Sequence, residues 1–284
     1  MSESLAVLMQ YLLPKQVSTR LAGVFASWRG GAASRMAIAA FARRYRVDMS
    51  EAAEPDLNAY ASFNDFFTRA LREDARPLAA ADLVCPVDGA VSECGAIAGE
   101  QIFQAKGHRY SAAALLGGDA ELAARFTDGA FATIYLSPRD YHRIHMPCSG
   151  RLVRMIHVPG RLFSVNPVMA RRIPGLFARN ERVVCLFEGE RGPFALVLVG
   201  AVIVGSIATV WHGTVTPPRH RRACIWNYAE GEGLALAQGA QMGHFMLGST
   251  VVALFGGPGA RFAPEWRTGC PVRMGEAMAS FAAP

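Results

Sequence analysis

The feature that most restricts the fold of this chain is a charge-free segment of 18 residues, Phe194 to Trp211, which reads FALVLVGAVIVGSIATVW. Its length just reaches the minimum for a helix that spans a membrane. Its many β-branched residues, the interruptions at Gly200 and Gly205, and the turn-forming sequences on both sides are instead typical of strands. We therefore expect two buried β segments here.

The character of the sequence changes near residue 80. Residues 1 to about 80 have helical spacing, with breaks at Pro14 and in the sequence RGGA at 29–32. From about residue 83, short runs rich in Val, Ile and Phe alternate with Gly, Pro and Asp, a pattern typical of strands and turns. The sequence predicts an α+β protein with N-terminal helices (residues 1–80) packed on a mainly antiparallel β body (residues 81–284).

The N-terminal region carries most of the positive charge. Residues 1–50 hold seven basic and two acidic residues, so they contribute +5 of the formal net charge of +6. Leu, Phe and Trp recur among them at near-helical spacing, at Leu5, Leu8 and Leu12 and again at Leu21, Phe25 and Trp28. A basic amphipathic helix of this kind suits an anionic lipid surface better than nucleic acid. Ordinary core packing is the alternative interpretation.

The six cysteines are scattered and form no C-x-x-C pair. This argues against a zinc ribbon and a thioredoxin-type site, and we predict no metal. The first residues contain an apolar stretch but lack the basic start of a secretory signal, so we expect a reducing, cytoplasmic compartment.

A glycine followed by a serine, Gly248-Ser249, stands in the apolar run FMLGSTVVALF at 245–255. Because nearly every residue of the run is apolar or small, we expect this strand to lie inside the body. Glycine within a strand often marks a bulge. The alternative is that the Gly-Ser bond is itself the site of chemistry.

Two further stretches carry chemically versatile side chains. Asp88 lies in PVDGAV, where Asp-Gly between apolar residues is a strong hairpin-turn signal. His142 and His145 lie in YHRIHMPCSG, with no obvious residues nearby to complete a zinc site. Asp88, His145 and Ser249 occur in one of the chain orders known for charge-relay sets. Ser249 has no G-x-S-x-G sequence around it, which disfavours an α/β-hydrolase.

Six segments together resemble a known family. PVDGAV, YHRIHMPCSG, LFSVNP, LFARNERVV, VGAVIVGSI and LGST occur in this order and at spacings similar to those of the bacterial, membrane-associated phosphatidylserine decarboxylases. The resemblance runs from about Phe63 to the end of the chain, and the first sixty residues match only in character.

The resemblance implies that the chain is a proenzyme that cuts itself between Gly248 and Ser249. The products are a large chain (1–248) and a small chain (249–284) that stay together as a heterodimer, while a higher oligomer is left open. Ser249 becomes a covalent pyruvoyl cofactor, and His145, oriented by Asp88, is the base that activates it. The pyruvoyl then forms a Schiff base with phosphatidylserine, which loses CO2 to give phosphatidylethanolamine. His142 is expected to transfer the proton, with His145 as the alternative. The expected location is peripheral, on the cytoplasmic face of the cell membrane, where the substrate lies in an anionic lipid surface.

Three other functions remain open at this level. A serine hydrolase would use Asp88, His145 and Ser249 without self-cleavage. A pyruvoyl enzyme acting on a soluble amino acid would not need the basic, apolar N-terminus. A β-rich binding module would leave Asp88 as a turn residue and Gly248 as a bulge.

Overall fold

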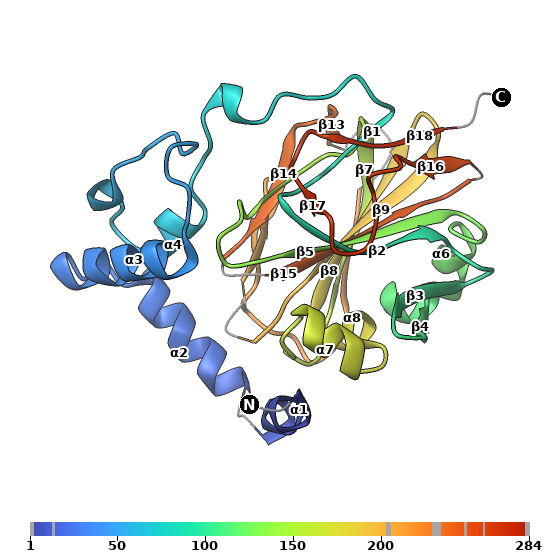
Figure 1. Cartoon of the computed structure of the whole chain (residues 1–284). Coiled ribbons are helices and arrows are strands. Elements are labelled where there is room, and N and C mark those ends of the chain that lie inside the picture. Colours follow the sequence, from blue (N-terminus) through green and yellow to red (C-terminus); the bar gives the residue numbers. More distant parts are fainter. Residues whose placement is uncertain are drawn as a thin grey trace.

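The computed structural model describes residues 3–12, 15–202, 206–228, 234–246, 249–257 and 259–281. Three of the N-terminal helices lie to one side of a large β body, the first helix lies below it, and further short helices lie below and beside that body (Figure 1). The predicted α+β class, with N-terminal helices and mainly antiparallel sheets, is confirmed.

The N-terminal helices have a small core of their own. They are α1 (Glu3–Leu12), α2 (Lys15–Ser27), α3 (Ala32–Tyr45) and α4 (Phe63–Phe67), with 3-10 turns at Leu57–Ala59 and Glu73–Ala75. Aromatic side chains of α4 pack with Ile38 of α3 and Ala26 of α2. Ser62 caps α4 by accepting a hydrogen bond from the Asp65 amide at 3.2 Å, which fixes where that helix begins.

The main sheet is antiparallel and has the strand order β12-β7-β8-β9-β15-β5-β2-β17, with β13 also paired to β7. Its strands are β2 (Gly89–Ala96), β5 (Ala130–Leu136), β7 (Gly150–Val158), β8 (Arg182–Gly189), β9 (Gly192–Val199), β12 (Cys224–Asn227), β13 (Ala235–Leu236), β15 (Ser249–Phe255) and β17 (Pro271–Val272).

Smaller elements cover the two faces of this sheet. One four-stranded sheet has the order β11-β10-β14-β6, and another has three strands in the order β1-β18-β16. Their strands are β1 (Leu83–Val84), β6 (Arg143–His145), β10 (Ile207–Thr209), β11 (Gly213–Thr216), β14 (Gln241–Phe245), β16 (Ala260–Phe262) and β18 (Ala277–Phe281). The hairpin of β3 (Gln101–Ala105) and β4 (His108–Ser111) accompanies α5 (Ala112–Leu115), α6 (Ala120–Ala124), α7 (Pro167–Arg172) and α8 (Leu176–Arg179).

Strand β15 is buried on both faces, as the sequence predicts. Val251, Ala253 and Phe255 belong to the core that includes residues of the four-stranded sheet, whereas Val252 and Leu254 belong to the core on the helical side. Because side chains alternate along a strand, Ser249 belongs to the same face as Val251. Ser249 therefore lies on the side of the main sheet that the four-stranded sheet covers.

The charge-free segment forms strands, as predicted. It contains most of β9 and all of β10, with residues 203–205 outside the described part of the chain. No helix among the described residues is long and apolar enough to cross a membrane.

The prediction of a hairpin turn at Asp88-Gly89 is wrong. Strand β1, before this pair, joins β18, whereas β2, after it, joins β5 and β17 in the main sheet. The glycine is needed for a different reason. A Cβ at Gly89 would lie 2.4 Å from the Tyr135 carbonyl oxygen of β5, which is too close for any side chain. The Asp-Gly pair marks a close approach of two strands that places Asp88 at the end of β2.

Replacing Gly89 by alanine tests this close approach. We expect Gly89→Ala to lower the free energy of unfolding by about 1–3 kcal/mol, because β2 must move away from β5. Urea denaturation measures the change. Gly23→Ala in α2 is the matched control: a methyl group at that position would have no neighbour within 4 Å, so a gain of about 0.5–1 kcal/mol is expected. Equal effects of the two substitutions would contradict this account.

Candidate active site

Ser249 is the first residue of β15, and its side chain is fully buried. Among the described residues, its Oγ has no hydrogen-bond partner, and neither has the Oγ1 of the next residue, Thr250. A buried hydroxyl without a partner loses its hydrogen bonds to water, which costs free energy that structural serines usually recover. Such an unpartnered group needs an explanation, and a catalytic role is one explanation. Gly248, the other half of the predicted cleavage site, lies outside the described residues.

Two backbone contacts link Ser249 and Phe245 to the chain that leads into the histidine motif. Ser249 pairs with Leu136, the last residue of β5. The Phe245 amide, at the end of β14, donates to the His142 carbonyl oxygen at 3.0 Å. The chain from Leu136 to His142 therefore has one end paired with Ser249 and the other end bonded to Phe245.

His142 is fully buried and precedes β6. Its Nδ1 lies 2.7 Å from the Asp140 carbonyl oxygen, and its Nε2 has no partner. A carbonyl oxygen can only accept, so Nδ1 carries the proton and Nε2 presents a free lone pair. Burial lowers the pKa of His142 to about 3, so the ring is neutral near pH 7. Phe67 of α4 packs on this ring at a centroid distance of 4.1 Å.

His145 is the last residue of β6, and both ring nitrogens are hydrogen-bonded. Nδ1 lies 2.8 Å from the Gly239 carbonyl oxygen, and Nε2 lies 3.0 Å from the Tyr141 hydroxyl. Nδ1 must therefore donate, and Nε2 of the neutral ring accepts the proton of Tyr141. Burial raises the pKa of Tyr141 to about 12, which keeps that donor protonated. Burial also lowers the pKa of His145.

The carboxylate of Asp88 is held by other groups than His145. Arg76 donates from Nε to both oxygens at 3.0 and 3.2 Å and from Nη2 to Oδ2 at 2.5 Å. The Met274 amide donates to Oδ1 at 2.9 Å, and Arg76 also pairs with Glu51 at 2.7 Å. The charge of Asp88 favours the protonated ring of His145, but the nearby charge of Arg143 disfavours it more strongly. The carboxylate and the imidazole are thus coupled by charge, without a direct hydrogen bond between them.

Strand pairing places two of the four predicted residues, Asp88 and Ser249, at the same end of the main sheet. Ala90 of β2, Tyr135 of β5 and Thr250 of β15 lie side by side across three neighbouring strands. Asp88, two residues before Ala90, therefore reaches the same edge of the sheet as Ser249.

Sequence reasoning overlooked three participants of this arrangement, namely Tyr141, Arg76 and the Gly239 carbonyl. Tyr141 stands directly before His142 in the histidine motif, so its position gave a signal. Arg76 occurs in ARPL, a sequence that resembles an ordinary loop, and a backbone carbonyl has no signature in a sequence.

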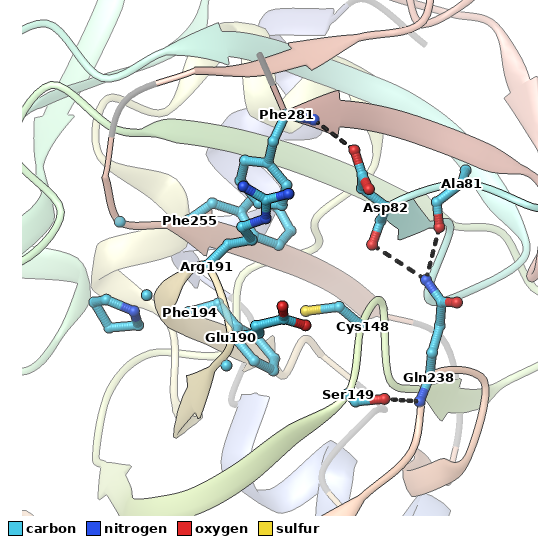
Figure 2. Close-up of a pocket in the computed structure, with 14 residues that line it drawn as sticks. Ala81, Asp82, Cys148, Ser149, Glu190, Arg191, Phe194, Gln238, Phe255 and Phe281 are labelled. Atoms are coloured by element: carbon cyan, nitrogen blue, oxygen red, sulfur yellow. Dashed lines mark hydrogen bonds between the residues drawn. The ribbon is translucent and has the colours of Figure 1, made fainter. Parts of the chain in front are cut away.

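A cavity of about 280 Å³ lies elsewhere in the fold and contains none of these residues (Figure 2). Gln238 closes one side of it by donating to the carbonyl oxygens of Ala81 and Asp82. Cys148 borders it, but burial raises the pKa of that thiol to about 12. The thiol therefore stays protonated near pH 7 and is a poor nucleophile. Among the described residues, no three His, Cys, Asp or Glu side chains are grouped so that they could hold a metal ion.

Comparison with known proteins identifies the family. The model of the family described as phosphatidylserine decarboxylase matches residues 63–280, and a second model, described as PSD, matches residues 5–46. A phosphatidylserine decarboxylase proenzyme of Methylibium petroleiphilum is 68% identical over 279 residues, which cover 98% of each chain. Proenzymes of the same name from Acidovorax ebreus and Chromobacterium violaceum are 67% and 63% identical, over 98% and 99% of this chain and 98% and 100% of their own lengths. With this similarity along almost its whole length, the chain belongs to the phosphatidylserine decarboxylase family.

Proposed function

We propose that this chain is a proenzyme that cuts itself between Gly248 and Ser249 and then decarboxylates phosphatidylserine to phosphatidylethanolamine and CO2. The observation that carries the proposal is Ser249 itself. It is fully buried, its Oγ has no partner, and it begins a strand at the centre of the main sheet. Membership of the family supplies the reaction.

Self-cleavage begins with the Ser249 hydroxyl. Its Oγ attacks the Gly248 carbonyl carbon, where no side chain obstructs the approach, while a base takes the hydroxyl proton. The new C–O bond replaces the C–N bond and gives an ester. Elimination of the ester releases the large chain with a free carboxylate, and hydrolysis then releases ammonia and leaves a pyruvoyl group on the small chain.

His145 is the base in this proposal, and Nε2 is the nitrogen that takes the proton once the Tyr141 hydroxyl turns away from its lone pair. Gly239 holds the proton on Nδ1, and Tyr141 holds Nε2 in its acceptor form. The imidazolium that forms is stabilised by the negative charge of Asp88, which Arg76 keeps in place. Asp88 thus contributes mainly through charge.

The burial of Ser249 also fits the cofactor that would replace its side chain. When present, the pyruvoyl carbonyl withdraws electrons from the bond between the substrate's α-carbon and its carboxylate. His142, neutral and with a free Nε2, would hold the proton that returns to the α-carbon. The buried surroundings of both residues exclude water from the site.

The two products of cleavage would remain together. The small chain would supply β15, which pairs along its whole length with β5 and along most of it with β9. It would also supply β16, β17 and β18. Removing it would expose both halves of the core, so a stable heterodimer is expected.

The N-terminal helices suit a lipid surface. In α2 and just beyond it, Val17, Leu21, Val24, Phe25 and Trp28 recur at helical spacing and are each more than half exposed. A soluble helix normally turns such a stripe inward. A cavity of about 840 Å³ lies between α2 and Met246, three residues before Ser249. We propose that the stripe contacts the membrane and that the lipid reaches the site through this cavity, past Arg20.

Ser249→Ala and Thr250→Val form a matched pair that tests the proposed function. Both remove a buried hydroxyl without a partner. We expect Ser249→Ala to give one uncut chain with only background decarboxylation of phosphatidylserine vesicles, and Thr250→Val to be cut and active. Denaturing gels and CO2 release measure both properties. An active wild-type enzyme in one uncut chain would favour a serine hydrolase instead.

Tyr141→Phe tests the role of Nε2 through the pH dependence of cleavage. The Tyr141 hydroxyl donates to the neutral form of His145 and so favours it; without this bond the pKa of His145 rises. Because the neutral ring is the base, the variant should lose cleavage at a higher pH than the wild type as the pH falls. Cleavage of freshly translated proenzyme, followed over time from about pH 5 to 8, measures the midpoint. An unchanged midpoint would contradict the assignment.

Leu21→Asp and Val24→Asp test the membrane surface. Each places a charge on the exposed stripe of α2. Vesicle flotation should show that binding to the vesicles is weaker by roughly tenfold or more. Val210→Asp is the control, because Val210 is half exposed and follows β10 at the end away from the cavity. Binding that all three variants retain would remove α2 from the proposal.

A further inference from the structure

Arginines gather around a cavity of about 320 Å³ on the side of Asp88 and Tyr141 that faces the loop after α3. Five arginines and four carboxylates line it, namely Arg46, Arg69, Arg76, Arg139 and Arg273 with Asp48, Glu51, Asp88 and Asp140. The first question is whether the charges of this cavity neutralise each other pairwise.

Each carboxylate in the cavity has partners of its own. Asp88 and Glu51 pair with Arg76, and Glu51 also receives a hydrogen bond from Arg273 at 2.8 Å. Asp140 accepts from the Ser137 amide at 2.6 Å and lies 3.6 Å from Arg139. Asp48 accepts from the amide and hydroxyl of Ser50. The carboxylates therefore make their hydrogen bonds and ion pairs with groups other than Arg69, on which Asp88 and Glu51 act only through their charge.

Arg69 is a buried cation of this cavity that takes part in none of these ion pairs. Arg69 comes two residues after the end of α4, and it is 5% exposed. Within the described part of the chain it makes one long hydrogen bond, from Nη2 to the Arg139 carbonyl oxygen at 3.4 Å. Its Nε is buried without a partner, and its guanidinium lies 5.3 Å from the centre of the Phe66 ring.

A buried guanidinium with so few partners is unfavourable. Taking a cation out of water is costly unless an anion or several acceptors replace the water. Contact with an aromatic ring recovers only part of that cost. The burial of Arg69 lowers its pKa, which is the expected sign of this desolvation. An anion in the cavity would supply the missing partner.

We propose that this cavity binds an oxyanion of the phosphate type, held by the Arg69 guanidinium with Arg46 at the rim. The planar fork of arginine suits two phosphate oxygens at once. The cavity is also lined by Tyr141, whose hydroxyl contacts His145, so a bound phosphate lies next to the proposed catalytic centre.

The phosphate has two sources, the phosphodiester of a lipid headgroup or free inorganic phosphate. Binding of free phosphate is independent of the proposed function. The lipid source rests on it, because only a lipid substrate would bring its headgroup to this place.

Binding to an uncut chain tests the site. The full chain carrying Ser249→Ala is titrated with inorganic phosphate and followed by calorimetry and thermal unfolding. We expect saturable binding that raises the melting temperature. Arg69→Met in the same chain should weaken it roughly tenfold or more, because charged hydrogen bonds are lost. Arg109→Met is the control, since exposed Arg109 lies on β4, away from α4 in Figure 1.

Arg69→Lys keeps the positive charge but loses the planar guanidinium. If Arg69→Met does not fold, this variant tests whether Arg69 binds phosphate. We expect phosphate binding weaker than in the parent chain. Absence of saturable phosphate binding, or equal losses in the Arg69 and Arg109 variants, would overturn the proposal. Neither result depends on whether the chain cleaves itself or decarboxylates a lipid.

A second experiment distinguishes the two sources in the enzyme with Ser249 intact. If the phosphodiester of the lipid occupies the cavity, Arg69→Lys raises KM for phosphatidylserine vesicles more than it lowers kcat, and inorganic phosphate competes with the lipid. If free phosphate is the occupant, inorganic phosphate does not compete with the lipid. Arg69→Lys then weakens phosphate binding and leaves KM for phosphatidylserine vesicles unchanged.

Discussion

The pairing of β15 with β5 and β9 is the interaction on which the rest of the structure depends. It fixes Ser249 at the end of a fully buried strand and links the two halves of the core. The same pairing serves two needs of a self-cleaving enzyme. In the proposed reaction it would hold Ser249 in a rigid frame before cleavage and would retain the small chain afterwards. A reacting group held by a rigid scaffold has part of the entropic cost of reaction already met.

Hydrogen bonds and charges have different roles at the two histidines of the candidate site. Tyr141 and Gly239 determine which nitrogen of His145 carries the proton, while Asp88 acts from a distance and is itself fixed by Arg76. In this arrangement the ion pair sets the charge near the imidazole, and neutral groups set its tautomer. His142 differs because it keeps one nitrogen free, which gives the two histidines different capacities in the proposed reactions.

The sequence predicted the elements that rest on local patterns. Apolar runs predicted the strands, and the buried character of residues 245–255 predicted the interior position of β15. The Asp-Gly pair at 88–89 was misinterpreted because a close approach to Tyr135 and a hairpin turn both require glycine. Only the three-dimensional pairing of β2 with β5 separates these two causes.

Part of the candidate site could not be predicted from one sequence. The motifs pointed to Asp88, His142, His145 and Ser249, but not to the partners that hold them. Arg76, Arg69 and Gly239 are distant in the chain from the groups they approach or have no local signature. Their importance comes from burial and from which atoms lack partners, and these properties arise only when the chain folds.

The intact mass of the purified protein under denaturing conditions tests the central claim most directly. The account predicts two chains, 1–248 and 249–284, with the small one lighter than a peptide that starts with serine by the mass of one ammonia. A single uncut chain in a preparation that decarboxylates phosphatidylserine would contradict it.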